Sequence, residues 1–361
     1  MIYSHTGAII LTISILPSLL ALGISVLGFK KHRYPHFLSM SISWLFIFLS
    51  IIFLSYAYWS LNILVYILAI LITIPIGFSI SWLIDTVSRV DMDVYKIIIL
   101  TFFSTLMLVF AFDEQAISIN ISKMNEVAPS LNGYFMLSGA IIFLLYSSLW
   151  FYYNTKIYYK SPSNIKKYAL LSLIGATMSG PIASLSFATG LVWLFPGIDY
   201  MFVSMGVFLS SYSFWKEPKL GYVLPFKVYA VISVDLISGI PLYSYEWNKI
   251  DELNIILFSG AIRGLFDLMG ESIGKGQVEE IKLKDAAIQI YNQSEHNVGF
   301  LLISSNVSKV LKIGLKAFAE EFCFVFRKEI NDDRYFVSQF DKADKIILEK
   351  FPFVPHKHYS H

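Results

Sequence analysis

Seven long apolar segments dominate the first 214 residues of this 361-residue chain. Each is close to the 17–25 residues that a helix needs to cross about 30 Å of hydrocarbon. Within lipid, a single segment satisfies its backbone hydrogen bonds only as a helix. The pattern therefore predicts an all-α transmembrane bundle with spans at 7–29, 37–58, 61–84, 94–112, 131–153, 168–188 and 191–214.

Charged residues divide the chain into two parts. Residues 1–214 hold 17 charges (10 basic, 7 acidic), whereas residues 215–361 hold 37 (18 basic, 19 acidic). The stretch 215–227 between them contains two prolines, which disfavour continuation of a helix. We therefore predict a seven-span domain over 1–214, a linker over 215–227 and an aqueous domain over 228–361.

Basic residues at the span ends predict the orientation, because Lys and Arg stay on the cytoplasmic side of a membrane. Only Lys123 falls on the opposite side. The predicted cytoplasmic residues are Lys30, Lys31, Arg33, Arg89, Lys156, Lys160, Lys166, Lys167, Lys216, Lys219 and Lys227. A multi-pass protein of the cell membrane follows, with its N-terminus outside, its last domain in the cytoplasm and its basic residues near anionic lipid heads.

Within the predicted spans, the pattern singles out one ionisable residue, Asp199, followed by Tyr200. Charges at that depth are costly and usually mark a ligand or a transport pathway. If the last span begins at residue 191, Asp199 lies near the membrane midplane; if it begins at residue 198, Asp199 lies at the outer rim. Pro181 is expected to kink the preceding span. The kink either shapes a ligand cavity or serves only the packing of the helices. Asp199, Tyr200 and Pro181 are the candidate ligand-binding residues.

The aqueous part combines strand and helix patterns. Asp251 is placed to cap a long helix after the second strand, and Ser305 or Asn306 to cap a later helix that packs Cys323 as an inert thiol. A last helix is predicted over 334–350. Strands are predicted near 228–234, 242–247, 280–284, 288–290 and 298–304. The order β-β-α-β-β-β-α-α defines an α+β domain.

This order resembles that of the longin and roadblock-like domains, in which helices pack on an antiparallel five-stranded sheet. The opening hairpin at 230–245, AVISVDLISGIPLYSY, and the long helix after it carry the resemblance. A PAS-like sensor fold is the alternative. The longin and roadblock resemblance implies a protein partner such as a small GTPase or its regulator, and pairing with a second copy of the chain.

The first 214 residues look like the seven-span sensor regions that precede histidine kinases and cyclase-type output domains. The resemblance rests on the span count, the orientation and the position in the chain. A kinase output module, with its histidine helix and nucleotide-binding domain, is not recognisable after residue 214. The resemblance therefore implies a sensor or an anchor without a kinase.

Motifs for catalysis, cofactors or metals are not recognisable in the aqueous part. The stretch 270–276 has a lysine between glycines but not the spacing of a phosphate-binding loop. His356, His358 and His361 lie in a terminal tail and are not expected to form a metal site. Residues 228–361 hold 15 basic and 18 acidic groups, a balance that does not favour nucleic acid.

Two functions remain open. In the first, the chain is a membrane signalling or recruitment protein, whose bundle senses or anchors while its cytoplasmic domain binds a protein. In the second, it is a membrane-embedded enzyme or transporter that acts through Asp199.

Overall fold

The structure, a computed structural model, describes residues 5–88, 94–121, 127–189, 191–224, 226–247, 255–273, 278–293, 295–330 and 337–354. The chain divides into two compact units, Met1–Leu224 and Pro225–His361, and each is described by itself. Most of the segment predicted as a linker belongs to the first unit, where Pro218–Tyr222 forms a short 3₁₀ helix, η2.

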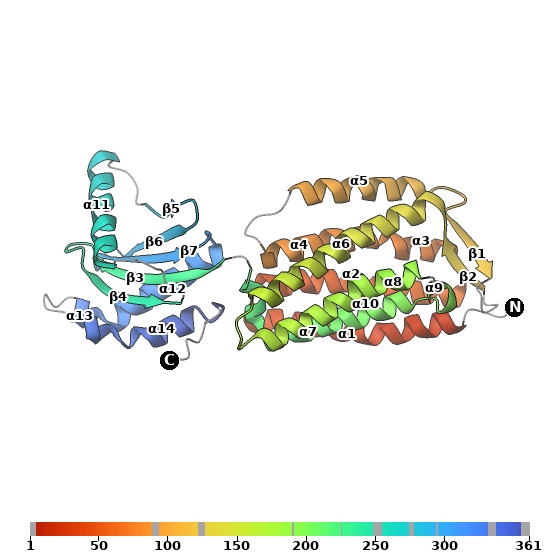
Figure 1. The fold of residues 1–361 in the computed structure, drawn as a ribbon, viewed down its shortest axis with the longest axis horizontal. Helices are drawn as coiled ribbons and strands as arrows, with labels where there is room; N and C mark the ends of the chain where they lie inside the picture. Colours follow the sequence, from red (N-terminus) through yellow and green to blue (C-terminus); the bar gives the residue numbers. More distant parts are fainter. Residues whose placement is uncertain are drawn as a thin grey trace. The chain divides into compact units, whose positions relative to one another are not determined.

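The first unit is a bundle of long helices that lie side by side (Figure 1). Between α5 and α6 the chain forms an antiparallel hairpin, β1 (Ile117–Ile121) and β2 (Val127–Leu131). The helices are α1 (His5–His32), α2 (Pro35–Ser60), α3 (Ile63–Leu71), α4 (Thr73–Ser88), α5 (Val94–Phe110), α6 (Gly133–Lys160), α7 (Lys166–Thr177), η1 (Met178–Ile182), α8 (Ala183–Ala188), α9 (Leu191–Leu194) and α10 (Ile198–Lys216).

Five of the predicted spans correspond to helices that are long and apolar enough to cross a membrane. They are Thr6–His32, Pro35–Ser60, Ile63–Val87, Gly133–Lys160 and Lys166–Ser186. The other two predicted spans correspond to α5, which has 17 residues, and to α9 with α10. Among the 19 residues of α10 are Asp199 and four serines, which make this helix less apolar. The five helices fit a membrane-embedded protein.

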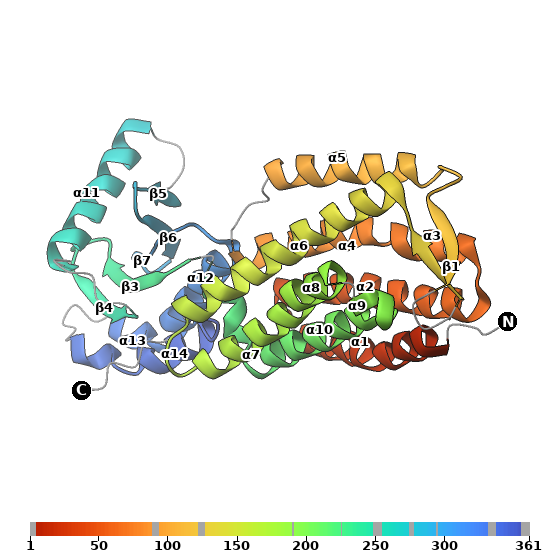
Figure 2. The ribbon, with the colours of Figure 1, turned by 45° about the vertical axis from the view of Figure 1, so that its right-hand side comes forward.

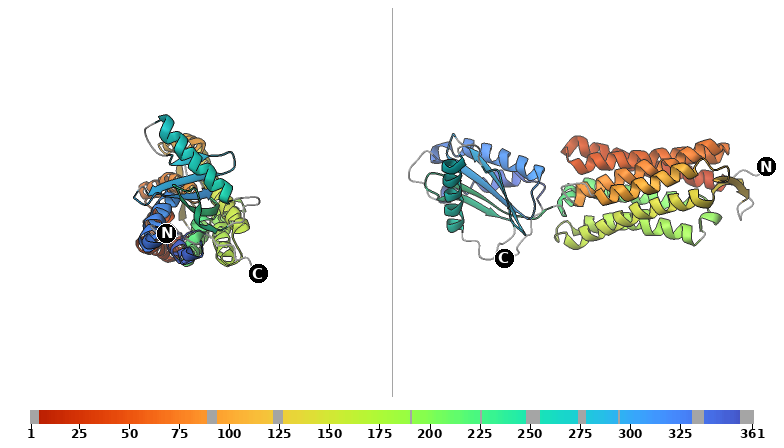
Figure 3. Two further views of the ribbon diagram at one scale, coloured as in Figure 1. Left: turned by 90° about the vertical axis from the view of Figure 1, so that its left-hand side faces the viewer. Right: turned by 90° about the horizontal axis from the view of Figure 1, so that it is seen from above.

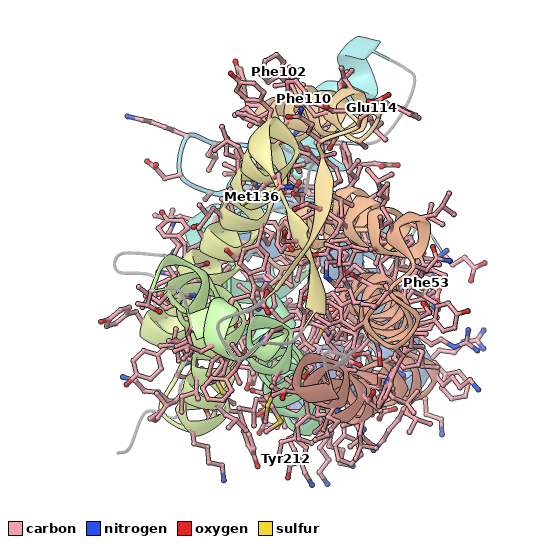
Figure 4. The ribbon with its side chains drawn as sticks, turned by 90° about the vertical axis from the view of Figure 1, so that its right-hand side faces the viewer. Phe53, Phe102, Phe110, Glu114, Met136 and Tyr212 are labelled. Carbon is pink, nitrogen blue, oxygen red and sulfur yellow. The ribbon has the colours of Figure 1, made fainter. Side chains whose placement is uncertain are left out.

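Many large apolar side chains lie on the outside of the bundle, and many small hydroxyl side chains lie inside it. Phe53 of α2 and Phe102 of α5 are 39% and 59% exposed, and both point away from the bundle (Figure 4). Serines such as Ser14 and Ser25 are fully buried, and each donates a hydrogen bond to the carbonyl four residues earlier. An apolar exterior is unfavourable in water but matches lipid, and small interior residues let helix backbones approach closely.

The second unit is built on a five-stranded antiparallel sheet with the order β4-β3-β7-β6-β5. Figure 3 shows this sheet with its helices in two further views. The strands are β3 (Val228–Asp235), β4 (Pro241–Glu246), β5 (Glu280–Lys282), β6 (Ala287–Gln293) and β7 (Val298–Ser304), and the helices are α11 (Ile255–Ile273), α12 (Lys309–Val325), α13 (Arg327–Ile330), η3 (Val337–Phe340) and α14 (Ala343–Lys350).

Helices cover both faces of this sheet. Ile232 of β3 and Leu301 of β7 pack with Ile262 of α11 on one face. On the other face, the rings of Phe300 and Phe322 of α12 have centroids 5.5 Å apart. Because both faces are covered, β3 and β7 are almost continuously buried, which explains their unbroken apolar sequence.

Local hydrogen bonds refine two predicted boundaries. Ser308, rather than Ser305 or Asn306, caps α12 by accepting a hydrogen bond from Val310 N at 3.3 Å. The Oγ of Ser305 instead accepts from Lys227 N. The helix predicted over 334–350 is divided between η3 and α14, and Asp251 lies outside the described residues.

Candidate functional site

A cavity of about 630 Å³ lies inside the bundle and is lined by residues of α2, α3, α4, α6, η1, α8 and α10. All three candidate residues, Asp199, Tyr200 and Pro181, line it. Toward the end of the bundle that carries β1 and β2, α6 diverges from α8 (Figures 1 and 2). Leu144 of α6 and Leu185 of α8 line the cavity and are also 48% and 59% exposed, so the cavity reaches the lateral surface there.

Asp199 lies in the first turn of α10, because the backbone reverses just before it. Gly197 has φ +84°, a left-handed conformation that favours glycine, and α10 begins at Ile198. Asp199 is half-buried, and its Oδ1 is buried and accepts no hydrogen bond from the described residues. The helix start at Ile198 is the one that predicts a position of Asp199 at the outer rim, and Asp199 lines the cavity.

Pro181 lies in η1, a π-helical turn between α7 and α8. Proline lacks the backbone N–H, and π-turns absorb such an interruption without ending the helix. The turn brings Gly180 against the backbone of Ser147 in α6: a Cβ on Gly180 would be 3.1 Å from Ser147 O. Because η1 and α6 are in contact at Gly180 while α6 and α8 diverge toward the β1–β2 end, space for the cavity remains between α6 and α8.

Two tryptophans extend the polar lining of the cavity. Trp44 of α2 and Trp150 of α6 are 1% and 3% exposed and line the cavity, and their ring centroids are 6.1 Å apart. Within the described part of the chain, the indole Nε1 of each has no hydrogen-bond acceptor. A buried donor without an acceptor costs about 1–3 kcal/mol. The cavity thus holds two unsatisfied donors and one unsatisfied acceptor.

Tyrosines surround the carboxyl group of Asp199. Tyr146 and Tyr200 line the cavity. Tyr58 and Tyr66, with ring centroids 6.1 Å apart, are close enough to Asp199 to interact with it electrostatically. Among the described residues, none forms an ion pair with Asp199.

A row of ring contacts leads from the cavity to η2. Trp150 contacts Phe214 of α10, with centroids 6.5 Å apart. Phe214 contacts His36 at 5.8 Å, and His36 contacts Tyr222 of η2 at 5.4 Å. His36 is 1% exposed, and its ring packs so tightly on Gly221 that a Cβ there would lie less than 3 Å from three ring atoms. We call Trp150, Phe214, His36 and Tyr222 the ring row.

An ion pair that the sequence pattern did not single out joins α4 to α5. Lys96 Nζ lies 2.5 Å from Asp85 Oδ1, and the side chains are 12% and 5% exposed. The Lys96 ammonium also lies 5.3 Å from the centroid of the Tyr153 ring. Each residue lies near the end of an apolar helix, where charges are common in membrane proteins. The sequence therefore does not indicate that the two residues pair, and the ion pair is recognisable only in the structure.

The second unit offers less evidence of a chemical site. Within the described residues there is no group of three His, Cys, Asp or Glu side chains placed to hold a metal. Tyr243 donates a hydrogen bond of 2.6 Å to Asp344, and burial raises the pKa of Tyr243. Burial also raises the pKa of Cys323 to about 12, which keeps the thiol protonated and unreactive at neutral pH.

The cavity combines residues that are far apart in the sequence, and this explains what the pattern missed. Asp199 was recognisable because an acidic residue is rare in an apolar segment. Trp44 and Trp150 carried no such signal, because tryptophan is common in membrane helices. Comparison with known protein families, with curated proteins and with solved structures found no match to this chain.

Proposed function

We propose that this chain is a membrane receptor in which the bundle binds a small ligand and the following domain binds a protein partner. The observation that carries the proposal is the ring row, which connects the cavity lining at Trp150 to Tyr222 in η2, shortly before the second unit begins. Packed rings transmit small displacements because cores are dense and resist compression. A ligand that moves Trp150 would therefore move η2.

The proposal includes the finer features predicted from the sequence. The bundle would contain seven spans, with α5 and α10 completing the five longer ones, and would place the N-terminus outside. The second domain would belong to the longin and roadblock-like group and would bind a small GTPase or its regulator. The strand order β4-β3-β7-β6-β5, with helices on both faces, supports this assignment.

The coupling is tested by filling the cavity. Ala140→Phe places a ring in the cavity, whereas Leu137→Phe, one turn earlier, places it at a position that is 52% exposed. In the full chain in nanodiscs, we expect Ala140→Phe to change amide hydrogen exchange over 218–224 and Leu137→Phe to leave it unchanged. Unchanged exchange in Ala140→Phe would contradict the coupling.

The partner is tested with purified small GTPases loaded with GDP or with a GTP analogue. We expect the full chain to retain a GTPase or its regulator with a preference for one nucleotide state. Retention in neither state would remove the GTPase assignment but leave the ligand-binding part of the proposal intact.

The orientation is tested with single cysteines in intact cells. A membrane-impermeant maleimide should label Ser118→Cys, in β1, from outside and should not label Ser163→Cys, between α6 and α7. Labelling of Ser163→Cys alone would reverse the orientation and place the second unit outside, where a GTPase partner is absent.

A membrane-embedded enzyme or transporter is the second candidate, and the position of Asp199 in the cavity supports it. In that case Asp199→Asn abolishes turnover or transport, while the second domain retains no partner. A receptor keeps its partner binding in Asp199→Asn and loses only its response to the ligand.

A further inference from the structure

The charge of Asp199 is the strongest constraint on what the cavity binds. Its Oδ1 is buried, and within the described residues it has no ion pair and no hydrogen bond to this oxygen. The partial positive charge at the start of α10 offsets part of the cost of a buried carboxylate. Water molecules would solvate the oxygen but would not neutralise it. A positively charged ligand group does both.

The surrounding rings favour the same sign of charge. Tyr146, Tyr200, Trp44 and Trp150 line the cavity. Aromatic faces carry negative electrostatic potential, so they attract cations and disfavour anions. In the described lining there is no Lys, Arg or His that would receive an anionic ligand.

The rest of the lining defines the shape of the ligand. Most of the remaining lining residues are apolar, and they include Val203 and Val207 of α10. Asp199 and Val207 are eight residue steps apart, which correspond to about 12 Å of helix at 1.5 Å per residue. The volume of about 630 Å³ accommodates a ligand with an apolar body of that length. The exposed leucines at the α6–α8 opening allow entry from the bilayer.

We propose that the cavity binds an amphipathic amine. Its protonated ammonium head pairs with the Asp199 carboxylate, and its apolar body extends along Val203 and Val207 toward Trp44 and Trp150. This inference rests on the proposed receptor function and names the class of its ligand.

The test uses three molecules with one chain and different heads: n-decylamine, 1-decanol and decanoate. Binding of labelled n-decylamine is measured on the full chain in nanodiscs, and site-specific binding is defined as the part that Ala140→Phe abolishes and Leu137→Phe keeps. We expect n-decylamine to bind more tightly than 1-decanol, and decanoate not to compete. Asp199→Asn should weaken n-decylamine at least about 10-fold, the value of a hydrogen bond to a charged group.

The SDS-unfolding transition of Asp199→Asn, compared with that of the wild type, shows whether the variant still folds. Equal site-specific affinities for n-decylamine and 1-decanol, or full n-decylamine affinity in Asp199→Asn, would overturn the amine assignment and leave the receptor proposal standing. Loss of the hydrogen-exchange response over 218–224, with binding retained, would overturn the receptor proposal instead. Preferential binding of decanoate would reverse the sign of the ligand charge and refute the inference.

Discussion

Replacement of Gly206 by alanine should separate α7 from α10. Gly206 faces Gly175, and a Cβ added to Gly206 would lie 2.7 Å from Ser179 N and 2.8 Å from Ser179 Cβ. Real Cβ atoms do not approach other atoms so closely, and the backbone nitrogen cannot rotate away. The nearest atom, Gly175 O, would lie closer still, so the helices must move apart along their contact.

The size of the effect follows from packing. Forcing an extra methyl group into a packed interior costs about 1–3 kcal/mol. Gly23 of α1 provides the matched control, because a Cβ there meets nothing within 4 Å. Alanine is better than glycine in a helix interior by about 1 kcal/mol, so Gly23→Ala should stabilise the bundle. The two variants should differ by about 2–4 kcal/mol.

Unfolding of the full chain by SDS in mixed micelles, followed by tryptophan fluorescence, measures both variants under one condition. We expect the transition of Gly206→Ala to move to a lower SDS fraction and that of Gly23→Ala to move to a higher one. Equal stability of the two variants would refute the close approach of α7 and α10, and with it the position of Asp199 relative to η1.

Three further experiments test other parts of the structure. Gly221→Ala places a methyl group against the His36 ring and should raise hydrogen exchange over 218–224. The affinity for n-decylamine should stay within about twofold of wild type, because the substitution does not alter the cavity lining. Normal exchange over 218–224 would contradict the ring row. Cys323 should react with iodoacetamide at pH 8 only after the chain unfolds, because burial raises its pKa to about 12 and keeps the thiol protonated. Labelling of the folded chain would show that the thiol is accessible. Asp85→Asn removes the ion pair with Lys96 from a buried position and should cost about 3–5 kcal/mol. Most of this should be restored by Asp85→Asn with Lys96→Met, and equal losses in the two variants would show that the pair contributes nothing.

The sequence predicted the elements of the second unit well, because strands and helices in water have distinct patterns. Alternation around Ile281 and the unbroken apolar run 298–304 located β5 and β7 to within one or two residues. The cap of α12 was harder to predict, since Ser305, Asn306 and Ser308 are all suitable residues and only the backbone geometry selects Ser308.

In the bundle, the sequence predicted helices but not their contacts. Lipid-facing and interior positions are both apolar, so periodicity does not show which side of α6 faces the cavity. Pro181 predicted a kink, but whether the kink opens a cavity depends on the path of α6, which diverges from α8 toward the end of the bundle that carries β1 and β2. Asp199 was identified from the sequence by its charge, whereas the tryptophans and tyrosines that line the same cavity were identified only from the structure.

The cavity costs the bundle stability, and this cost favours a ligand-binding role over simple packing. The atoms that line a cavity have fewer dispersion contacts than atoms in a filled core, and one polar atom each of Asp199, Trp44 and Trp150 has no hydrogen-bond partner among the described residues, at a cost of about 1–3 kcal/mol each. Small residues such as Ala140 and Ser184 line the same space, so larger side chains at these positions would fill it without a change of fold. Elsewhere the bundle packs closely enough for Gly175 and Gly206 to touch. An open, partly polar cavity in such a bundle is what a site for a bound molecule requires, because the ligand supplies the missing contacts and stabilises the state that holds it.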